Sequence, residues 1–192
     1  NRYEAELGLP KDSIRQLNAS NADANAWARL ERSELDLESF CELFEAEAAA
    51  AGHRLDARRV LACLSGRVRP EMVAALERIK PHYKTACLTN NAATGAGPGM
   101  AREPETATEI ARIMALFDTI VESSKVGIRK PEPRFYEIAC EALAVSPTRA
   151  VYLDDLGVNL KPARAMGMAT IKVVTAAEAL AELEAVLGLA LR

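Results

Sequence analysis

Apolar residues follow two different periods along this chain, and the change comes near residue 80. The clearest helix is predicted over Leu35–Ala51. Within it, Phe40 and Phe44 lie four positions apart, as residues on one face of a helix do, and Asp36 stands where a helix is commonly capped. Shorter stretches with helical spacing precede and follow it. The first part of the chain is therefore predicted to consist of helices.

From Thr85 onward, short apolar runs alternate with helical stretches. Continuous apolar strands separated by helices are typical of a parallel sheet with helices on both faces. We therefore predict a helical module over residues 1–80, followed by a doubly wound, Rossmann-like α/β domain over residues 81–192. The predicted strands are Thr85–Thr89, Thr119–Val121, Ala150–Leu153 and Ala169–Val174.

Composition adds exclusions to this picture. The chain has 192 residues, of which 49% are hydrophobic and 27% charged, as in ordinary globular proteins. A formal net charge of −3 argues against nucleic acid or an anionic membrane surface as a partner. Every apolar run is shorter than the roughly 18 residues that a membrane helix needs. The 4 cysteines form no CxxC pair, as expected of reduced thiols in a cytoplasmic protein.

Polar side chains follow three of the predicted strands at the point where each strand ends. Thr89 and Asn90 end the first strand, Lys130 follows the second, and Asp154 and Asp155 follow the third. Because the carboxyl ends of parallel strands meet at one edge of a sheet, we expect these groups to converge. Hydroxyl, amide and ammonium donors suit phosphate oxygens, and carboxylates suit magnesium. The set predicts a site for an anion beside a divalent cation.

The residues alone leave two alternatives open. Lys125 competes with Lys130 for the anion, because both follow the second strand and spacing does not choose between them. Two crowded carboxylates at Asp154 and Asp155 favour a metal, which relieves their repulsion. The alternative is an acidic turn that caps the helix at Asn159.

Three segments resemble motifs of the haloacid dehalogenase superfamily. They are CLTNN at 87–91, KVGIRKPEPRFY at 125–136 and VYLDDLGVNLKPARAMGM at 151–168, which resemble motifs two, three and four. The spacing is most similar to that of the phosphatase-like N-terminal domain of soluble epoxide hydrolase and its free-standing bacterial relatives. The helical first part resembles the small helical cap of that family, which implies a cap over residues 1–80 and a core over residues 81–192.

The resemblance implies a role for each matched residue at the anion site. Thr89 and Asn90 match the residues that bind phosphoryl oxygens. Lys130 directly precedes Pro-Glu-Pro, as the lysine of motif three does, and this resemblance favours it over Lys125. Thr89 and Lys130 are thereby also implied in catalysis.

The same resemblance implies a magnesium site and a reaction. Asp155 matches a Mg²⁺ ligand, with Asp154 and Asn159 as supporting residues around the metal and the lysine. The implied activity is hydrolysis of a small phosphorylated metabolite through an aspartyl-phosphate intermediate. A cap of this kind closes over the site and sets substrate preference.

The first motif of the family, an Asp-x-Asp after the first strand, is absent from this sequence. In the family, the segment with that motif also forms the central strand, between the strands matched here by Thr85–Thr89 and Ala150–Leu153. Without it, buried main-chain groups would stay unpaired at about 1–3 kcal/mol each. We therefore expect roughly 15–25 further residues upstream of Asn1, carrying the nucleophile.

Two other functions compete with this interpretation. A 2-haloacid dehalogenase uses an aspartate nucleophile on the same fold without a metal, and the DDxxxN pattern at 154–159 argues against it. A non-catalytic relative that lacks the nucleophile would bind a phosphorylated ligand or a protein partner without turnover.

Overall fold

The first part of the chain is helical, as predicted, and its apolar faces meet in one core. In the computed structural model, which describes residues 2–63, 68–93 and 104–192, Phe40 and Phe44 are fully buried with their rings stacked at 5.4 Å. Trp27 meets Phe40 edge to face at 5.7 Å. The helices of this module are α1 (Arg2–Glu6), α2 (Ser13–Ala19), α3 (Ala26–Glu31), α4 (Leu37–Ala50) and α5 (Ala57–Ala62).

The ends of α4 follow the signals in its sequence. The Asp36 carboxylate accepts a hydrogen bond from the main-chain N–H of Ser39 at 2.8 Å, so the predicted cap is confirmed. After the helix, Gly52 has a φ of 80°, a left-handed conformation that glycine adopts without steric cost. The predicted helix and the observed one differ by one or two residues at each end.

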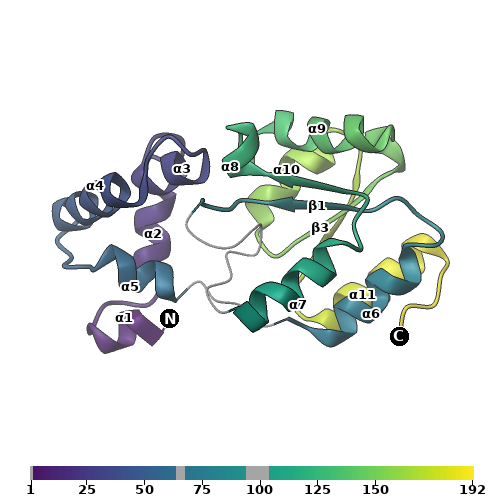
Figure 1. Ribbon diagram of the computed structural model, residues 1–192, viewed down its shortest axis with the longest axis horizontal. Helices are drawn as coiled ribbons and strands as arrows, with labels where there is room; N and C mark the ends of the chain where they lie inside the picture. Colours follow the sequence, from purple (N-terminus) through teal and green to yellow (C-terminus); the bar gives the residue numbers. More distant parts are fainter. Residues whose placement is uncertain (1, 64–67, 94–103) are drawn as a thin grey trace.

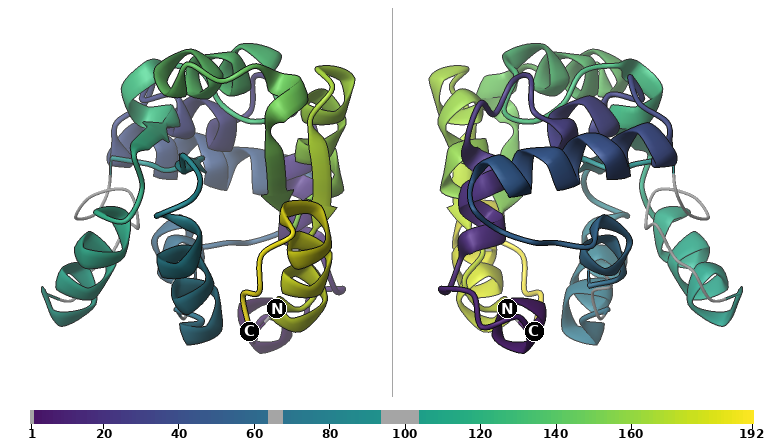
Figure 2. Two further views of the ribbon diagram at one scale, coloured as in Figure 1. Left: turned by 90° about the vertical axis from the view of Figure 1, so that its right-hand side faces the viewer. Right: turned by 90° about the vertical axis from the view of Figure 1, so that its left-hand side faces the viewer.

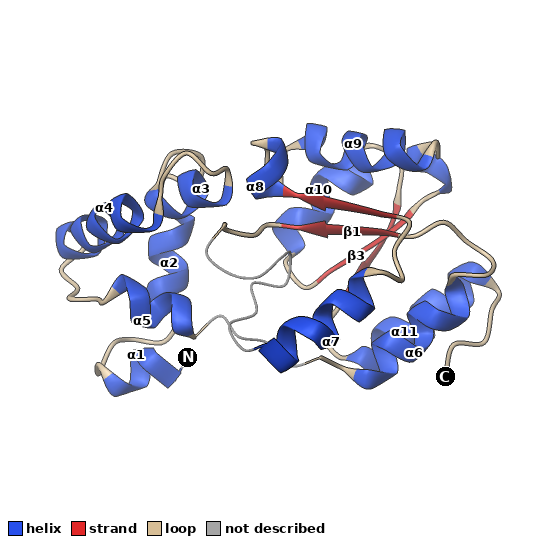
Figure 3. Cartoon of the chain, in the orientation of Figure 1, coloured by secondary structure: helices blue, strands red, loops and turns tan. Residues whose placement is uncertain are grey.

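The second part contains parallel strands, as predicted, and the fold class is confirmed. β1 (Ala86–Thr89) pairs with β2 (Thr119–Glu122), and β3 (Val151–Asp154) pairs with β4 (Ala169–Lys172). Figure 3 shows the strands gathered in this part and helices alone in the other. Each strand lies within about two residues of the range expected from its apolar run.

Helices flank both strand pairs (Figure 1). α9 packs on β1 and β2, and α10 packs on β3 and β4. The four-residue α8 was not predicted, because so short a helix shows no periodicity. A short 3₁₀ turn, Pro147–Arg149, precedes β3. The helices are α7 (Pro104–Met114), α8 (Ser123–Val126), α9 (Pro133–Leu143), α10 (Gly157–Ala165) and α11 (Ala176–Leu187). Within the described residues, no helix is long and apolar enough to cross a membrane.

Helix α6 (Pro70–Ile79) begins at the predicted Pro70 but packs with the α/β part. Ala75 shares a buried cluster with Ile171 and Leu180, and α6 lies beside α11 in Figure 1. The predicted boundary at residue 80 therefore differs from the packing, which joins α6 to the second part. Amphipathic spacing shows that a helix has a buried face, but it does not identify the element that covers that face.

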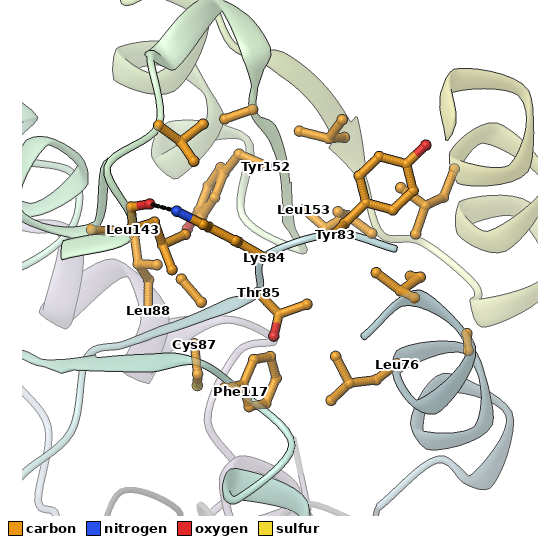
Figure 4. Close-up of a pocket in the computed structure, with 18 of the residues that line it drawn as sticks. Leu76, Tyr83, Lys84, Thr85, Cys87, Leu88, Phe117, Leu143, Tyr152 and Leu153 are labelled. Carbon is orange, nitrogen blue, oxygen red and sulfur yellow. Dashed lines mark hydrogen bonds between the residues drawn. The ribbon is translucent and has the colours of Figure 1, made fainter. Parts of the chain in front are cut away.

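The two strand pairs are separate two-stranded sheets in the part of the chain that the structure describes. The left view of Figure 2 shows them apart, with α9 on one side. A cavity of about 1000 Å³ lies between β1 and β3 and is lined by apolar side chains of both. In Figure 4, Cys87 and Leu88 of β1 and Tyr152 and Leu153 of β3 surround it. The sequence places the expected central strand here, and that strand stays a prediction.

Candidate active site

An ion pair between Lys130 and Asp154 lies at the carboxyl end of β3. The Lys130 ammonium Nζ donates to Asp154 Oδ2 at 2.9 Å, and the two side chains are 13% and 5% exposed. Lys130 comes from the loop between α8 and α9, and Asp154 is the last residue of β3. The structure thus brings together two residues that lie 24 positions apart in the sequence. Shielding from water strengthens their attraction and makes any loss of one partner costly.

The Asp154 carboxylate accepts four hydrogen bonds. Oδ2 accepts from Lys130 and from the Tyr152 hydroxyl at 2.7 Å. Oδ1 accepts from the main-chain N–H of Leu156 at 2.8 Å and the Asn159 amide at 3.0 Å. Burial alone would raise the pKa of Asp154, but the Lys130 charge and these donors hold that pKa below its usual value. Asp154 is therefore a fixed anion that orients Lys130.

Asn90 holds the main chain of Lys130 at two points. Its amide Nδ2 donates to the Lys130 carbonyl at 3.0 Å, and its Oδ1 accepts from the Lys130 N–H at 2.8 Å. The Asn90 side chain thus holds the lysine loop, and the predicted contact of Asn90 with phosphoryl oxygens stays a prediction. Thr89 ends β1, half-buried, and its hydroxyl makes no hydrogen bond within the described residues. That hydroxyl can donate to an anion.

Asp155 differs sharply from its neighbour Asp154. It is exposed, and among the described residues it makes no hydrogen bond or ion pair. A free carboxylate at a strand end suits a hard cation, whereas Asp154 has no lone pair to spare. In the described ranges no three His, Cys, Asp or Glu side chains gather as a metal group. Among the described residues of the predicted site, Asp155 offers the carboxylate without a partner, so its role as a Mg²⁺ ligand stays a prediction, and a complete site needs further ligands.

Tyr136 and Tyr152 support the site and were missed by sequence reasoning. Tyr136 donates to the main-chain carbonyl of Asn159 at 2.7 Å, and its ring meets that of Tyr152 edge to face at 5.1 Å. Burial and the nearby Asp154 charge raise the pKa of Tyr152, which keeps its hydroxyl a donor at neutral pH. Its position two residues before Asp154 on a strand, hence on the same face, is the signal that could have found it.

Lys125, the competing lysine, lies elsewhere at the sheet edge. Its side chain is 73% exposed and pairs with Glu122 at the end of β2. Glu122 is buried and also accepts from the Asn91 amide at 3.0 Å. Asn91 N–H donates to the Ser123 hydroxyl at 2.9 Å, which ties the ends of β1 and β2 together. The geometry therefore places Lys130, and not Lys125, beside Asp154.

Comparison with known sequences places this geometry in a family. A family model for haloacid dehalogenase-like hydrolases matches residues 2–167. Bifunctional epoxide hydrolase 2 of Mus musculus is 42% identical over 120 residues, which cover 62% of this chain and 21% of that protein. Acyl-CoA dehydrogenase family member 10 of Mus musculus is 32% identical over 192 residues, 97% of this chain and 17% of that protein. The chain thus spans about a fifth of the length of these relatives.

Further matches include a smaller relative and solved structures. A protein named as a phosphatase from Mycobacterium tuberculosis is 31% identical over 100 residues, 52% of this chain and 43% of that protein. A hydrolase structure of this fold from Porphyromonas gingivalis has a TM-score of 0.61 at 18% identity and covers 92% of this chain and 89% of that one. An enzyme from Bacteroides thetaiotaomicron, solved with magnesium and inorganic phosphate, has a TM-score of 0.55 at 14% identity, with coverage of 82% and 79%.

Proposed function

Since the chain belongs to the haloacid dehalogenase-like hydrolase family, we propose that it acts as a magnesium-dependent phosphatase on a small phosphate monoester. The observation that carries the proposal is the shielded Lys130–Asp154 pair at the end of β3. The Thr89 hydroxyl at the end of β1 and the Asp155 carboxylate directly after β3 make no hydrogen bond within the described residues. An oriented ammonium, an unused hydroxyl and an unpaired carboxylate suit a phosphoryl group beside a cation. The relative named as a phosphatase adds support.

The residues of this chain would act chiefly by orientation and charge. Asp154 keeps the Lys130 ammonium in place, and Asn90 fixes the main chain of the same lysine. The ammonium would then offset the negative charge of the phosphoryl oxygens, to which the Thr89 hydroxyl would donate. Mg²⁺, when bound with Asp155 as one ligand, would reduce the repulsion between an anionic nucleophile and an anionic substrate.

The nucleophile in this proposal is an aspartate outside the sequence of 192 residues. A β-strand in the cavity between β1 and β3 would pair with the free edges of both and bring that aspartate to the strand ends beside Lys130. Its carboxylate attacks phosphorus as the ester P–O bond breaks, and a second aspartate two residues later protonates the leaving alcohol. That second aspartate then activates water, which releases phosphate and restores the nucleophile.

A screen of phosphate monoesters against the full-length protein tests the proposal. We expect phosphate release that requires Mg²⁺ and no halide release from 2-haloacids. Metal-independent halide release would instead support a dehalogenase. The non-catalytic alternative would be established by two results together. The native polypeptide would start at Asn1, as judged by its intact mass and N-terminal sequence, and it would bind a phosphate analogue without turnover.

A further inference from the structure

Arg129 directly precedes Lys130 in the sequence, yet its side chain turns away from the aspartate pair toward the helical module. Its Nε donates to Glu31 Oε2 at 2.6 Å, and its Nη1 donates to the main-chain carbonyl of Ala22 at 3.0 Å. The Arg129 and Glu31 side chains are only 15% and 13% exposed. Salt screens such a shielded pair far less than a surface pair. Two directed bonds from one guanidinium therefore join the two parts of the molecule.

The far end of this pair is anchored in the core of the helical module. Glu31 ends α3, and its second oxygen, Oε1, accepts from the Trp27 indole N–H at 3.1 Å, one helical turn away. The Trp27 ring in turn packs against Phe40 at 5.7 Å and Phe44 at 6.1 Å between ring centroids. Glu31 is thus fixed to the buried aromatic cluster and is expected to move together with the helical module.

The near end of the pair is the lysine loop. The Arg129 N–H donates to Glu132 Oε1 at 3.2 Å, and the next residue, Lys130, is held through both main-chain groups by Asn90. The Lys130 side chain reaches Asp154. Arg129 and Lys130 are joined by one peptide unit. A displacement of Arg129 is therefore expected to move the main chain of Lys130 and, with it, the Lys130 ammonium.

We propose that Arg129 is a positioning residue that couples the placement of the helical module, through Glu31, to the orientation of Lys130. The role of Lys130 in turnover rests on the proposed function, but the coupling itself is a property of these contacts. Through this coupling, the position of the helical module would affect the position of the Lys130 ammonium, which in the proposed function contacts the phosphoryl group. Closure of the module and alignment of the lysine would then occur together.

A second contact between the two parts provides a matched control. The Ser33 hydroxyl donates to the main-chain carbonyl of Ser124 in α8 at 2.8 Å and makes no hydrogen bond to Arg129 or Lys130. Removing it should loosen the module without moving the lysine loop. The exposed Arg58–Glu38 pair within the module, with side chains 57% and 82% exposed, controls for the loss of an arginine charge.

The test is amide hydrogen exchange of residues 26–33 and 127–132 in Arg129→Gln, Glu31→Gln and the double variant, with Ser33→Ala and Arg58→Gln as controls. We expect each single substitution to accelerate exchange in both segments by about tenfold, and the double variant to go no further. Ser33→Ala should affect only the module segment, and Arg58→Gln neither. Unchanged exchange at 127–132 in both Arg129→Gln and Glu31→Gln, or additive effects, would overturn the coupling.

Steady-state kinetics of the full-length protein separate positioning from simple structural support. We expect Arg129→Gln to lower kcat by about tenfold while KM changes less than about twofold, because the lysine charge is retained but misaligned. Urea midpoints would show whether either variant is unfolded, and Glu31→Gln tests the same contact from the other side. An unchanged kcat in both would contradict the proposal. Exchange needs no turnover, so a parent protein that hydrolyses no ester would contradict only the proposed function.

Discussion

At the scale of single residues, the two adjacent aspartates have opposite environments. The sequence predicted that Asp154 and Asp155 lie at a strand end, because they follow an apolar run. It also predicted that their side chains point in opposite directions, because neighbours on a strand do so. It did not show which one is buried, because that depends on contacts with residues distant in the sequence, such as Lys130, which lies 24 positions before Asp154. The structure buries Asp154 under four donors and leaves Asp155 exposed. The hydroxyl of Tyr152 belongs to the same network, and the sequence did not predict its role.

The two lysines after β2 give a direct comparison. Lys130→Met removes the ammonium held by Asp154, and we expect kcat/KM for a phosphate ester to fall by about 10²–10³-fold. Lys125→Met removes an exposed charge paired with Glu122, and its kcat/KM should stay within about threefold of the parent. Both rates are measured in the full-length protein with Mg²⁺. Equal losses in the two variants would return Lys125 to consideration as the phosphate lysine.

The Tyr152 hydroxyl should contribute measurably to folding. Tyr152→Phe removes one donor to the buried Asp154 carboxylate, so we expect the free energy of unfolding to fall by about 1–2 kcal/mol. The matched control is Tyr83→Phe, which removes a hydrogen bond from an exposed tyrosine to the Leu187 carbonyl and should change it by less than about 0.5 kcal/mol. Urea unfolding at pH 7 measures both. A Tyr152→Phe effect as small as the control would show that Asp154 does not depend on this donor.

At the scale of elements, local signals located the strands and helices but not all of their neighbours. Asp36 and Pro70 marked helix starts that the structure confirms. Apolar runs marked the strands because such runs bury both faces of a sheet. The pattern did not reveal that α6 packs on α11, and it missed α8, which is only 4 residues long. The packing of α6 on α11 depends on a contact between segments that are distant in the chain, and a helix as short as α8 shows no periodicity.

Asp118 ties the start of β1 to the start of β2 and predicts a pH dependence. Its carboxylate accepts from the Thr85 main-chain N–H at 2.7 Å and from the Thr85 hydroxyl at 3.2 Å. The first of these bonds is the larger cause that holds the pKa of Asp118 below its usual value. The unfolded chain therefore binds this proton more readily, so the stabilisation exists above the unfolded pKa of about 3.9 and is lost as pH falls through the folded pKa.

Asp118→Asn keeps an oxygen acceptor but does not titrate, so it isolates this effect. We expect the parent to be more stable than Asp118→Asn at pH 7, with the difference shrinking below about pH 4. Urea midpoints of both proteins from neutral to acid pH provide the measurement, and other titrating groups cancel in the difference. A difference that stays constant over this range would show that the Asp118 charge adds nothing to folding.

At the scale of the whole molecule, two features organise the structure. Hydrogen bonds of Arg129 and Ser33 and the packing of Ala92 into the core of the helical module join it to the α/β part, and the two strand pairs face each other across an apolar cavity. The resemblance noted in the sequence implies that the absent Asp-x-Asp and the central strand belong to one segment, so a strand between β1 and β3 is predicted together with that motif. Nothing in the sequence predicted the contact of Arg129 with the helical module, because an arginine beside the motif lysine is equally compatible with an exposed, solvated side chain.

The cavity makes a prediction for Cys87, whose side chain lines it. If a strand fills the space, the Cys87 thiol should react with a maleimide at least about tenfold more slowly in the full-length protein than in residues 1–192 alone. Cys63, which is exposed, serves as the internal reference and should react alike in both. Mass spectrometry of the two labelled peptides provides the rates. Equal Cys87 rates in the two proteins would mean that nothing covers this part of the cavity.

The Mg²⁺ dependence of phosphate release by the full-length protein and by Asp155→Asn tests the account most directly. We predict that release by the parent rises to saturation with Mg²⁺ and stops with a chelator. Asp155→Asn should need at least about tenfold more Mg²⁺ for half its maximal rate, because it loses a charged ligand. The result that would contradict the account is phosphate release that neither the chelator nor Asp155→Asn changes.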